Sequence, residues 1–303
     1  MKKWLIVVRA QQVLTLPLVL ALLGAAIAWY HSHLPEEDSG FDFGYAALAF
    51  VGILIAHVSV NVLNDYFDFR SGIDLKTQRT MFSGGSGALP EGLIRPRQAL
   101  WLGIGSLIII VPIGVYFTLT IGWGLLPLLL IAAGCIVLYS PLILKMGWPE
   151  WAAGVGLGSL PVLGAFFIQT GAYPMTAVIA SIPSGILVHN LLLLNEFPDV
   201  DADKTANRRT MPIVLGKRRS ALIFSTLTGI VYLWIIGAVI VGQMPSFTLL
   251  GLLTLPLAVK AIRASLHYED MDRLVPGMAS NVMVVLLTQL LIAIGYIIEG
   301  TRL

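Results

Sequence analysis

Residues 46–74 read AALAFVGILIAHVSVNVLNDYFDFRSGID, an apolar run whose last fourteen positions hold two asparagines and three aspartates. About 20 apolar residues in an α-helix are enough to cross the ~30 Å hydrocarbon core of a bilayer. The stretch therefore predicts a membrane-spanning helix with acidic side chains at one mouth. Aspartates so close to a membrane span indicate a function, because a charged side chain is costly to place in a bilayer.

The rest of the chain has the same apolar character. Of its 303 residues, 57% are hydrophobic and 12% are charged, which is more apolar surface than a soluble domain can bury. We predict an all-α, multi-pass membrane protein that forms a single domain over residues 1–303. About nine transmembrane helices are expected, at roughly 10–30, 44–66, 98–119, 122–140, 150–170, 174–196, 219–241, 246–265 and 279–298.

Basic residues set the expected orientation. Of the 19 Lys and Arg residues, all except Arg302 lie in the N-terminal segment, in the loops after the second, fourth, sixth and eighth helices, or at the loop end of the eighth. Basic loops tend to face the cytoplasm. We therefore expect an integral protein of the cell membrane, with its N-terminus and acidic loops in the cytoplasm and its C-terminus outside. The charge pattern does not support a nucleic-acid partner.

The first acidic loop follows the second predicted helix. On a helix, Asn64 or Asp65 and Asp68 share one face, because residues three or four positions apart are neighbours there. A glycine break after this helix would let Asp74 fold back toward them. The same loop contains GGSG at 84–87. It lacks the GK[ST] ending of a nucleotide-binding loop, so a flexible flap over a bound anion and a simple turn are the open alternatives.

The second acidic loop, about 197–218, repeats this pattern after the sixth predicted helix. In NEFPDVDADK, Asn195, Asp199 and Asp203 are spaced i, i+4 and i+8, so one helical face would carry all three. Pro198 leaves two alternatives, a kinked helix or the start of a new turn. One acidic cluster alone would be an ordinary solvated helix end. Two matching clusters on one side of the membrane favour a binding site.

The chemistry of the clusters favours a hard cation. All candidate ligands are carboxylate or amide oxygens, without histidine or cysteine, and this set suits Mg²⁺ rather than zinc. Mg²⁺ usually keeps waters and shares its shell with a substrate phosphate. Basic side chains lie nearby in the sequence: Arg70, Lys76, Arg79, Lys204, Arg208 and Arg209. We therefore predict a site for a diphosphate held through metal ions.

The repeated motif also suggests an internal duplication of helices one to four and five to eight. Secondary transporters show such repeats, so a transporter is the remote alternative function. Transporter sites lie near the bilayer midplane at broken helices, whereas these acids lie at the expected cytoplasmic mouth. An enzyme that acts on a diphosphate fits this placement better.

Three stretches carry a resemblance to a known family. NDYFDFRSGID, then FSGGSGALPEGLI, and later NEFPDVDADKTANRRTMPIVLG resemble the two signature loops of the UbiA superfamily of intramembrane prenyltransferases. The family's first motif is NDxxDxxxD, but here five residues separate Asp68 from the last acid, Asp74. That spacing and RRTMPIVLG resemble the branch that attaches polyprenyl chains to 1,4-dihydroxy-2-naphthoate in menaquinone synthesis. Asp199 and Asp203 meet the second motif, DxxxD.

The resemblance implies a UbiA-like helical bundle with two Mg²⁺ ions on the diphosphate of a polyprenyl donor. The ligands would be Asn64, Asp65, Asp68 and Asp74 for one ion, and Asn195, Asp199 and Asp203 for the other. Asp68 and Asp199 would be central to catalysis, because neutralising the leaving group promotes formation of an allylic cation. The candidates to take up charge on the departing diphosphate are Lys145, Lys204 and Arg209.

The acceptor is implied by the same resemblance. Its aromatic ring would attack the allylic carbon, and 1,4-dihydroxy-2-naphthoate would then lose its carboxyl as CO₂. Tyr139 would face the cation, orient the acceptor or anchor its helix at the interface. The isoprenoid tail would lie in an apolar chamber open sideways to lipid. Sister branches leave other acceptors open: 4-hydroxybenzoate, homogentisate, a chlorin, haem or a glycerol-phosphate lipid.

Overall fold

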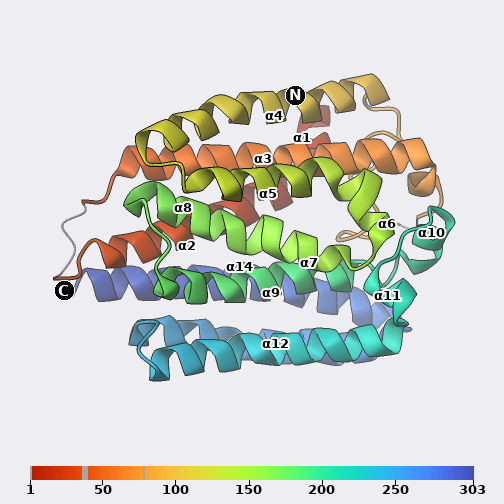
Figure 1. Cartoon of the computed structure of the whole chain (residues 1–303). Helices are drawn as coiled ribbons and strands as arrows, with labels where there is room; N and C mark the ends of the chain where they lie inside the picture. The colour runs from red at the N-terminus through yellow and green to blue at the C-terminus, as the bar shows by residue number, and fades with distance from the viewer. Residues whose placement is uncertain (1, 36–39, 78) are drawn as a thin grey trace.

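The computed structural model describes residues 2–35, 40–77 and 79–303. Within these ranges the chain is helical, without a β-strand, and nine segments are long and apolar enough to span a membrane (Figure 1). Single helices form six of the spans: α2 (Ala10–His31), α3 (Phe43–Ser71), α4 (Pro96–Thr120), α9 (Met175–Asn195), α12 (Lys217–Ile240) and α14 (Met271–Gly300). Over the described residues, the predicted number of spans is confirmed.

The other three spans change helix type along their length. They are α5 (Leu125–Leu138) with the π-helical turn η2 (Tyr139–Ile143) and α6 (Leu144–Met146); α7 (Pro149–Gly154) with the π-helical turn η3 (Val155–Ser159) and α8 (Leu160–Thr170); and the 3₁₀ segment η4 (Ser246–Thr254) with α13 (Leu255–Leu266). Single π-helical turns inside α-helices are frequent at functional sites. Of these three spans, the first matters most for the site, because η2 presents Tyr139 and Ser140.

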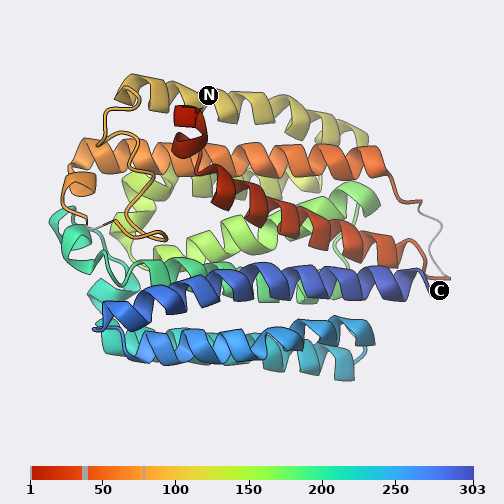
Figure 2. The ribbon, with the colours of Figure 1, turned by 180° about the vertical axis from the view of Figure 1, so that it is seen from behind.

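Four short helices complete the fold: α1 (Lys2–Val7), the 3₁₀ turn η1 (Ile73–Leu75), α10 (Val200–Thr205) and α11 (Met211–Val214). In Figures 1 and 2, α10, α11 and the turn after α3 lie at one end of the bundle, and the C-terminus lies at the other. Both acidic loops therefore share one end, as the sequence predicts. That this end faces the cytoplasm, and that the two halves arose by duplication, stay predictions.

Caps at both ends define α3. The Asp42 side chain accepts a hydrogen bond from the Tyr45 backbone N–H (2.9 Å) at its start. The helix ends before Gly72, whose φ of 76° is a left-handed conformation that glycine adopts readily. α3 continues past the predicted end at residue 66 to Ser71, and this extra turn carries Asp68. The chain then turns into η1, which brings Asp74 back toward α3.

Burial differs strongly between the spans. The largest apolar core lies among α2, α8, α9, α12 and α14, with Leu20, Phe166 and Ile235 fully buried. In contrast, only 22% of the spanning window of α4, and 6% of that of α5 to α6, is buried. These exposed apolar faces suit contact with lipid.

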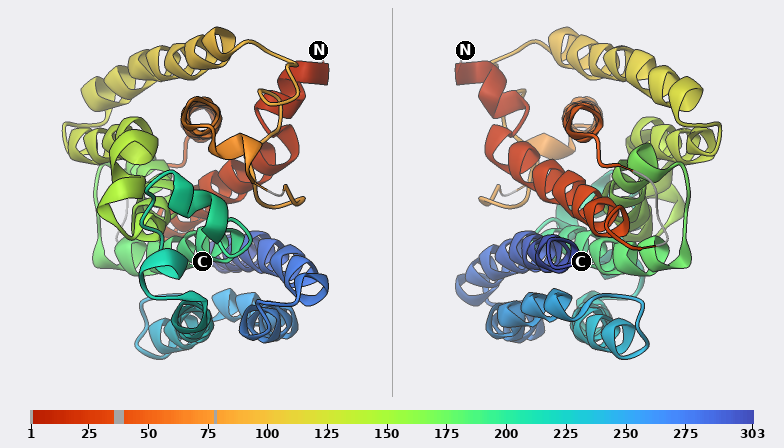
Figure 3. Two further views of the ribbon diagram at one scale, coloured as in Figure 1. Left: turned by 90° about the vertical axis from the view of Figure 1, so that its right-hand side faces the viewer. Right: turned by 90° about the vertical axis from the view of Figure 1, so that its left-hand side faces the viewer.

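Seen end-on in Figure 3, α3 lies inside the arrangement, and it packs against α2, α4 and α8. The fifth and sixth spans approach closely because both carry small residues. A Cβ added at Gly158 would lie 2.7 Å from the Ser184 carbonyl oxygen. This contact fixes α9, and with it the start of the second acidic loop, beside the fifth span.

Candidate active site

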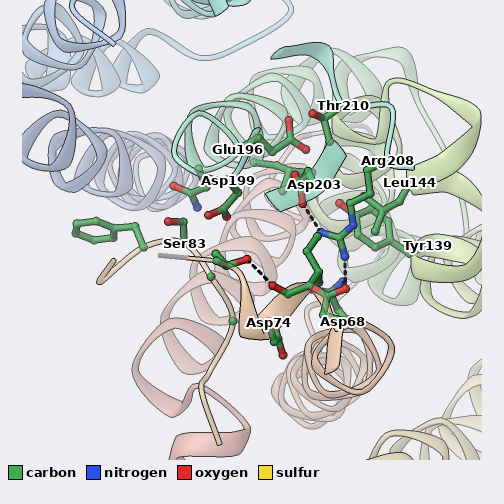
Figure 4. Close-up of a pocket in the computed structure, with 18 of the residues that line it drawn as sticks. Asp68, Asp74, Ser83, Tyr139, Leu144, Glu196, Asp199, Asp203, Arg208 and Thr210 are labelled. Atoms are coloured by element: carbon green, nitrogen blue, oxygen red, sulfur yellow. Dashed lines mark hydrogen bonds and ion pairs between the residues drawn. The ribbon is translucent and has the colours of Figure 1, made fainter. Parts of the chain in front are cut away.

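Both acidic loops line one cavity of about 120 Å³ at the end of the bundle (Figure 4). Seven residues singled out from the sequence are among its lining: Asn64, Asp68, Asp74, Tyr139, Asn195, Asp199 and Asp203. Asn64 and Asn195, which are 131 positions apart in the chain, are thus brought to one cavity, which the matching motifs alone could only suggest. The lining also contains residues that the sequence interpretation did not assign to it: Arg9, Ser83, Glu196, Arg208 and Thr210.

The first cluster is held by contacts within the protein. Asn64 Nδ2 donates hydrogen bonds to Ser140 Oγ (3.0 Å) and to Asp68 Oδ1 (3.5 Å). Asp65 is buried and turned toward Arg9, whose Nη2 donates to Asp65 Oδ1 (2.5 Å). Asp65 therefore lies beside the other acids of this cluster but, paired with Arg9, does not line the cavity as the other three expected ligands do.

The GGSG segment lies against this cluster. The Ser86 backbone N–H donates to Asp65 Oδ2 (3.2 Å), and Gly84 and Gly85 line the cavity. A Cβ at Gly85 would lie 3.3 Å from a carboxylate oxygen of Asp65 and from one of Asp74. Glycine therefore lets the backbone approach the acids closely, and the segment forms part of the cavity wall; its role as a flap stays a prediction.

The second cluster is built on a break in the chain. α9 ends at Asn195 and α10 begins at Val200, so Pro198 belongs to a new turn rather than to a kinked helix. Asp199 directly precedes α10, and the Asp203 backbone N–H donates to the Asp199 carbonyl oxygen (2.8 Å). The three predicted ligands therefore come from two helices and the turn between them.

Arg208 joins the two clusters. Its Nη1 donates to Asp203 Oδ1 (2.9 Å), and its Nη2 pairs with Asp68 Oδ1, as the dashed lines in Figure 4 show. Burial lowers the pKa of Arg208, but the neighbouring Asp68 and Asp203 more than offset this effect and raise it. Arg208 therefore stays charged and neutralises one acid from each loop.

Arg9 pairs with one further acid of the first loop, Asp65. It stands between α1 and α2 in a left-handed conformation (φ 48°), which is uncommon outside glycine. An isolated arginine in an apolar segment is the sequence signal that could have drawn attention to it. The ion pair with Asp65 explains why this charge is tolerated there.

The three cations expected at the diphosphate lie elsewhere. Lys204 is exposed and pairs with Asp201 (3.4 Å). The Arg209 side chain is exposed too, and its backbone ties the loop to the fourth span through an N–H donated to the Leu144 carbonyl (2.8 Å). Lys145 lines a neighbouring cavity rather than the acidic one. The structure brings none of the three into the acidic cavity.

Burial disfavours the ionised form of the carboxyl groups in and beside this cavity. Burial, then repulsion from Asp68 and Asp65, raises the pKa of Asp74 to about 7. Burial and the neighbouring Asp203 raise the pKa of Asp199 to about 7 as well. Burial and Glu150 raise the pKa of Glu196 well above its ordinary value. A cation that binds in the cavity would therefore stabilise the ionised form of these carboxyl groups.

Several oxygens in the lining are unpaired. Over the described residues, Asn195 Oδ1 and Asp199 Oδ1 are buried without a hydrogen-bond partner, and the buried Glu196 carboxyl lies against that of Glu150. Buried polar atoms without a protein partner are rare in folded proteins, so these oxygens are free to bind a ligand. Hard oxygen donors fit Mg²⁺. In the part of the chain that is described, no three carboxylate, histidine or cysteine side chains already converge as a metal site, and Arg208 instead joins the carboxylates of the two loops.

Glu150 is a buried acid that sequence reasoning missed. It is fully buried at the start of the fifth span, and its Oε1 accepts a hydrogen bond from the Met211 backbone N–H (2.5 Å). This contact anchors the end of the second acidic loop to α7. Nothing in its local sequence, WPEWAAG, distinguishes it from an interfacial acid.

Over the described residues, the structure is thus a helical bundle with nine segments able to span a membrane, and acids, amides and two arginines line a cavity at one end. Residues 18–276 match the UbiA prenyltransferase family, and the chain belongs to that family.

Several relatives cover nearly the whole chain. The 1,4-dihydroxy-2-naphthoate octaprenyltransferase of Bacillus subtilis (strain 168) is 28% identical over 95% of this chain and 90% of its own length. The enzyme of that name from Haemophilus influenzae is 23% identical over 94% and 93%. The human UbiA prenyltransferase domain-containing protein 1 is 25% identical over 78% of this chain and 67% of its own.

Solved structures share the fold at low identity. A UbiA homologue from Aeropyrum pernix K1 superimposes with a TM-score of 0.67 at 16% identity, over 96% of this chain and 98% of that one. A UbiA homologue from Archaeoglobus fulgidus, bound to GPP and Mg²⁺, gives a TM-score of 0.60 at 14% identity, over 99% and 98%. The all-α membrane fold predicted from the sequence is therefore that of this family.

Proposed function

We propose that the protein transfers a polyprenyl group from a polyprenyl diphosphate to 1,4-dihydroxy-2-naphthoate, a step of menaquinone synthesis. The observation that carries the proposal is the meeting of both acidic loops at one cavity, with buried oxygens that lack partners over the described residues. The names of the Bacillus and Haemophilus relatives support the choice of acceptor. Membership of a prenyltransferase family favours this enzyme over the transporter alternative.

The cavity offers ligands for Mg²⁺ from both loops. We assign Asn64, Asp68 and Asp74 to one ion and Asn195, Asp199 and Asp203 to the other, all of which line the cavity. Asp65 would reach a metal ion only after release from Arg9 and Ser86. When bound, Mg²⁺ neutralises the charge that develops on the diphosphate. The Archaeoglobus homologue bound to GPP and Mg²⁺ supports this choice of metal.

Two arginines of this chain would bind the diphosphate oxygens. Arg208 and Arg9 line the cavity, whereas Lys204 and Arg209 do not. A guanidinium group can donate two parallel hydrogen bonds to a phosphate, so each arginine can exchange a carboxylate partner for the diphosphate. Because Arg208 holds one acid from each loop, this exchange would loosen both clusters together.

The transfer then needs an oriented leaving group and a shielded carbon. The bond between the allylic carbon and the diphosphate oxygen breaks, and its electron pair leaves with the diphosphate. The ring carbon that bears the carboxylate forms the new carbon–carbon bond, and the bond to the carboxylate breaks with its electron pair returning to the ring, so that CO₂ leaves in place of a ring proton. Tyr139, in the cavity wall, would place its ring beside the positive allylic carbon.

Incubation of the purified protein with a labelled polyprenyl diphosphate and a panel of acceptors tests the proposal. We expect a prenylated product and an equal amount of CO₂ with 1,4-dihydroxy-2-naphthoate and Mg²⁺, and neither in the presence of EDTA. Product from 4-hydroxybenzoate, homogentisate, a chlorin, haem or a glycerol-phosphate lipid instead would replace the acceptor. Full turnover in EDTA would refute the role of the metal.

A further inference from the structure

A second cavity, of about 430 Å³, adjoins the acidic one. It lies between the end of α3, the π-helical turn η2 with α6, and the segment after α10. The two cavities share Asp68, Leu144 and Arg208 in their walls. The ion pair of Arg208 with Asp68 therefore stands at the boundary between them.

The size and shape of this cavity suit an organic molecule. Pockets that bind small molecules usually enclose about 300–1,000 Å³, and the acidic cavity, at about 120 Å³, is smaller than that. Tyr66 and Phe67 contribute adjoining aromatic rings, with centroids 5.3 Å apart and planes at 71°. Leu144 and Pro141 add apolar surface. A planar ring would find edges and faces to pack against.

The charge of the second cavity is opposite to that of the first. Its wall contains Arg70, Lys145 and Arg208 but a single acid, Asp68, which already pairs with Arg208. Among the residues that the structure describes, no carboxylate pairs with Arg70 or Lys145. The cavity therefore presents two positive charges without a partner at an exposed rim, where an anion from water can enter.

We propose that this second cavity binds the aromatic acceptor through its carboxylate. Lys145 and Arg70 hold the carboxylate at the rim, and the ring lies along Tyr66 and Phe67 toward the boundary shared with the acidic cavity. This assignment rests on the proposed function and gives Lys145 a role on the acceptor rather than on the diphosphate. It also gives the two substrates separate entries, since the polyprenyl chain comes from lipid and the aromatic acid from water.

Lys145 and Arg70 would also attract an inorganic anion such as diphosphate, so the test compares the aromatic acid with that anion. The probes are 1-hydroxy-2-naphthoate, its carboxyl-free counterpart 1-naphthol, and inorganic diphosphate, each titrated without polyprenyl donor by the protein's tryptophan fluorescence. Loss of a hydrogen bond to a charged group weakens binding by about tenfold or more. Lys145→Met and Arg70→Met should each weaken 1-hydroxy-2-naphthoate binding by that factor and leave 1-naphthol binding unchanged. Lys145→Arg should keep most of the affinity.

Lys204→Met is the matched control, because Lys204 is an exposed lysine of the same region that lines neither cavity. It should bind all three probes as the unaltered protein does. In turnover assays, Lys145→Met should raise the KM for the acceptor by about tenfold and leave the KM for the polyprenyl diphosphate within about twofold.

Three outcomes would overturn the assignment: equal weakening of 1-hydroxy-2-naphthoate and 1-naphthol, weakened binding of inorganic diphosphate alone, or unchanged binding of all probes. Because the titrations need no donor and no turnover, they report on this cavity even if no acceptor in the panel is prenylated. Failure of the proposed function and failure of this assignment are thereby distinguished.

Discussion

The two acidic loops look alike in sequence, but the folded chain provides their polar side chains with different numbers of hydrogen-bond and ion-pair partners. In the first, Arg9 and the Ser86 backbone hold Asp65, and Ser140 holds Asn64. In the second, the described part of the chain offers no hydrogen-bond partner to the buried Asn195 Oδ1 and Asp199 Oδ1. The first loop is thus organised before any ligand arrives. The second is also held by protein contacts, such as the Arg208–Asp203 ion pair, but it leaves more of its buried oxygens unpaired.

Arg208 shows why this difference matters. It belongs to the second loop, yet it also pairs with Asp68 of the first. Without metal ions, one guanidinium therefore compensates acids from both loops, and Asp199 is left outside this arrangement. A ligand that brings positive charge should stabilise the second loop more than the first.

The largest expected effect is on turnover. Asp68→Ala and Asp199→Ala should each lower kcat by about two orders of magnitude or more, because each weakens charge neutralisation at the same leaving group. The double variant should be little worse than either single one, since the residues act as a unit. Asp201→Ala is the control, because that side chain is exposed beside Lys204. Multiplicative losses in the double variant would mean that the loops act separately.

The next effect is on pH dependence. Asp74 and Asp199, each with a pKa raised to about 7, must lose a proton to bind a metal ion. Mg²⁺ affinity should therefore fall by about tenfold per ion between pH 8 and pH 6, and it should level off above pH 8. Titration of Mg²⁺ at fixed pH measures it. An affinity that stays constant from pH 6 to 8 would show that these carboxyls are not ligands.

The metal-free protein should respond to pH in the opposite direction. Raised carboxyl pKa values mean that the folded chain binds more protons than the unfolded chain between about pH 4 and pH 7, so the free energy of unfolding falls as pH rises through this window. Thermal unfolding in EDTA at pH 5 and pH 8 measures the change. Greater stability at pH 8 would contradict the pKa shifts.

The smallest effect separates the two loops by stability. In EDTA at pH 8, the free energy of unfolding of Asp68→Asn should lie about 1–3 kcal/mol below that of Asp199→Asn, because only the former change removes a charged partner of Arg208. Asp199→Asn should raise the free energy of unfolding, since the change removes a buried charge that has a raised pKa. Thermal unfolding of both variants in detergent checks this. Destabilisation of equal size in both would mean that the loops are equivalent after all.

Short stretches of sequence were enough to predict the membrane spans and most of the residues of the site. The spans follow from apolar runs, and the grouping of six acids and amides follows from motif spacing and a shared membrane side. The predicted end of the second span, at residue 66, falls short of the end of α3, because Asp65, Asp68 and Arg70 lower the hydropathy although they continue the same helix.

The choice of cations could not be made from the sequence. Arg208 and Arg209 are neighbours, but the backbone bonds of Arg209 to Leu144 and Trp148 leave its side chain exposed while Arg208 lines the cavity. Arg9 reaches Asp65 from 56 residues away. The direction in which each arginine side chain points depends on how distant helices pack together. A local sequence pattern does not contain this information.

The central claim is that two metal ions and both loops share one diphosphate. The most direct measurement is the number of Mn²⁺ ions bound to the purified protein with inorganic diphosphate, and their magnetic coupling, by electron paramagnetic resonance. We predict two coupled ions per chain, and a single uncoupled ion in both Asp68→Ala and Asp199→Ala. One ion in the unaltered protein, or two ions without coupling, would contradict the claim.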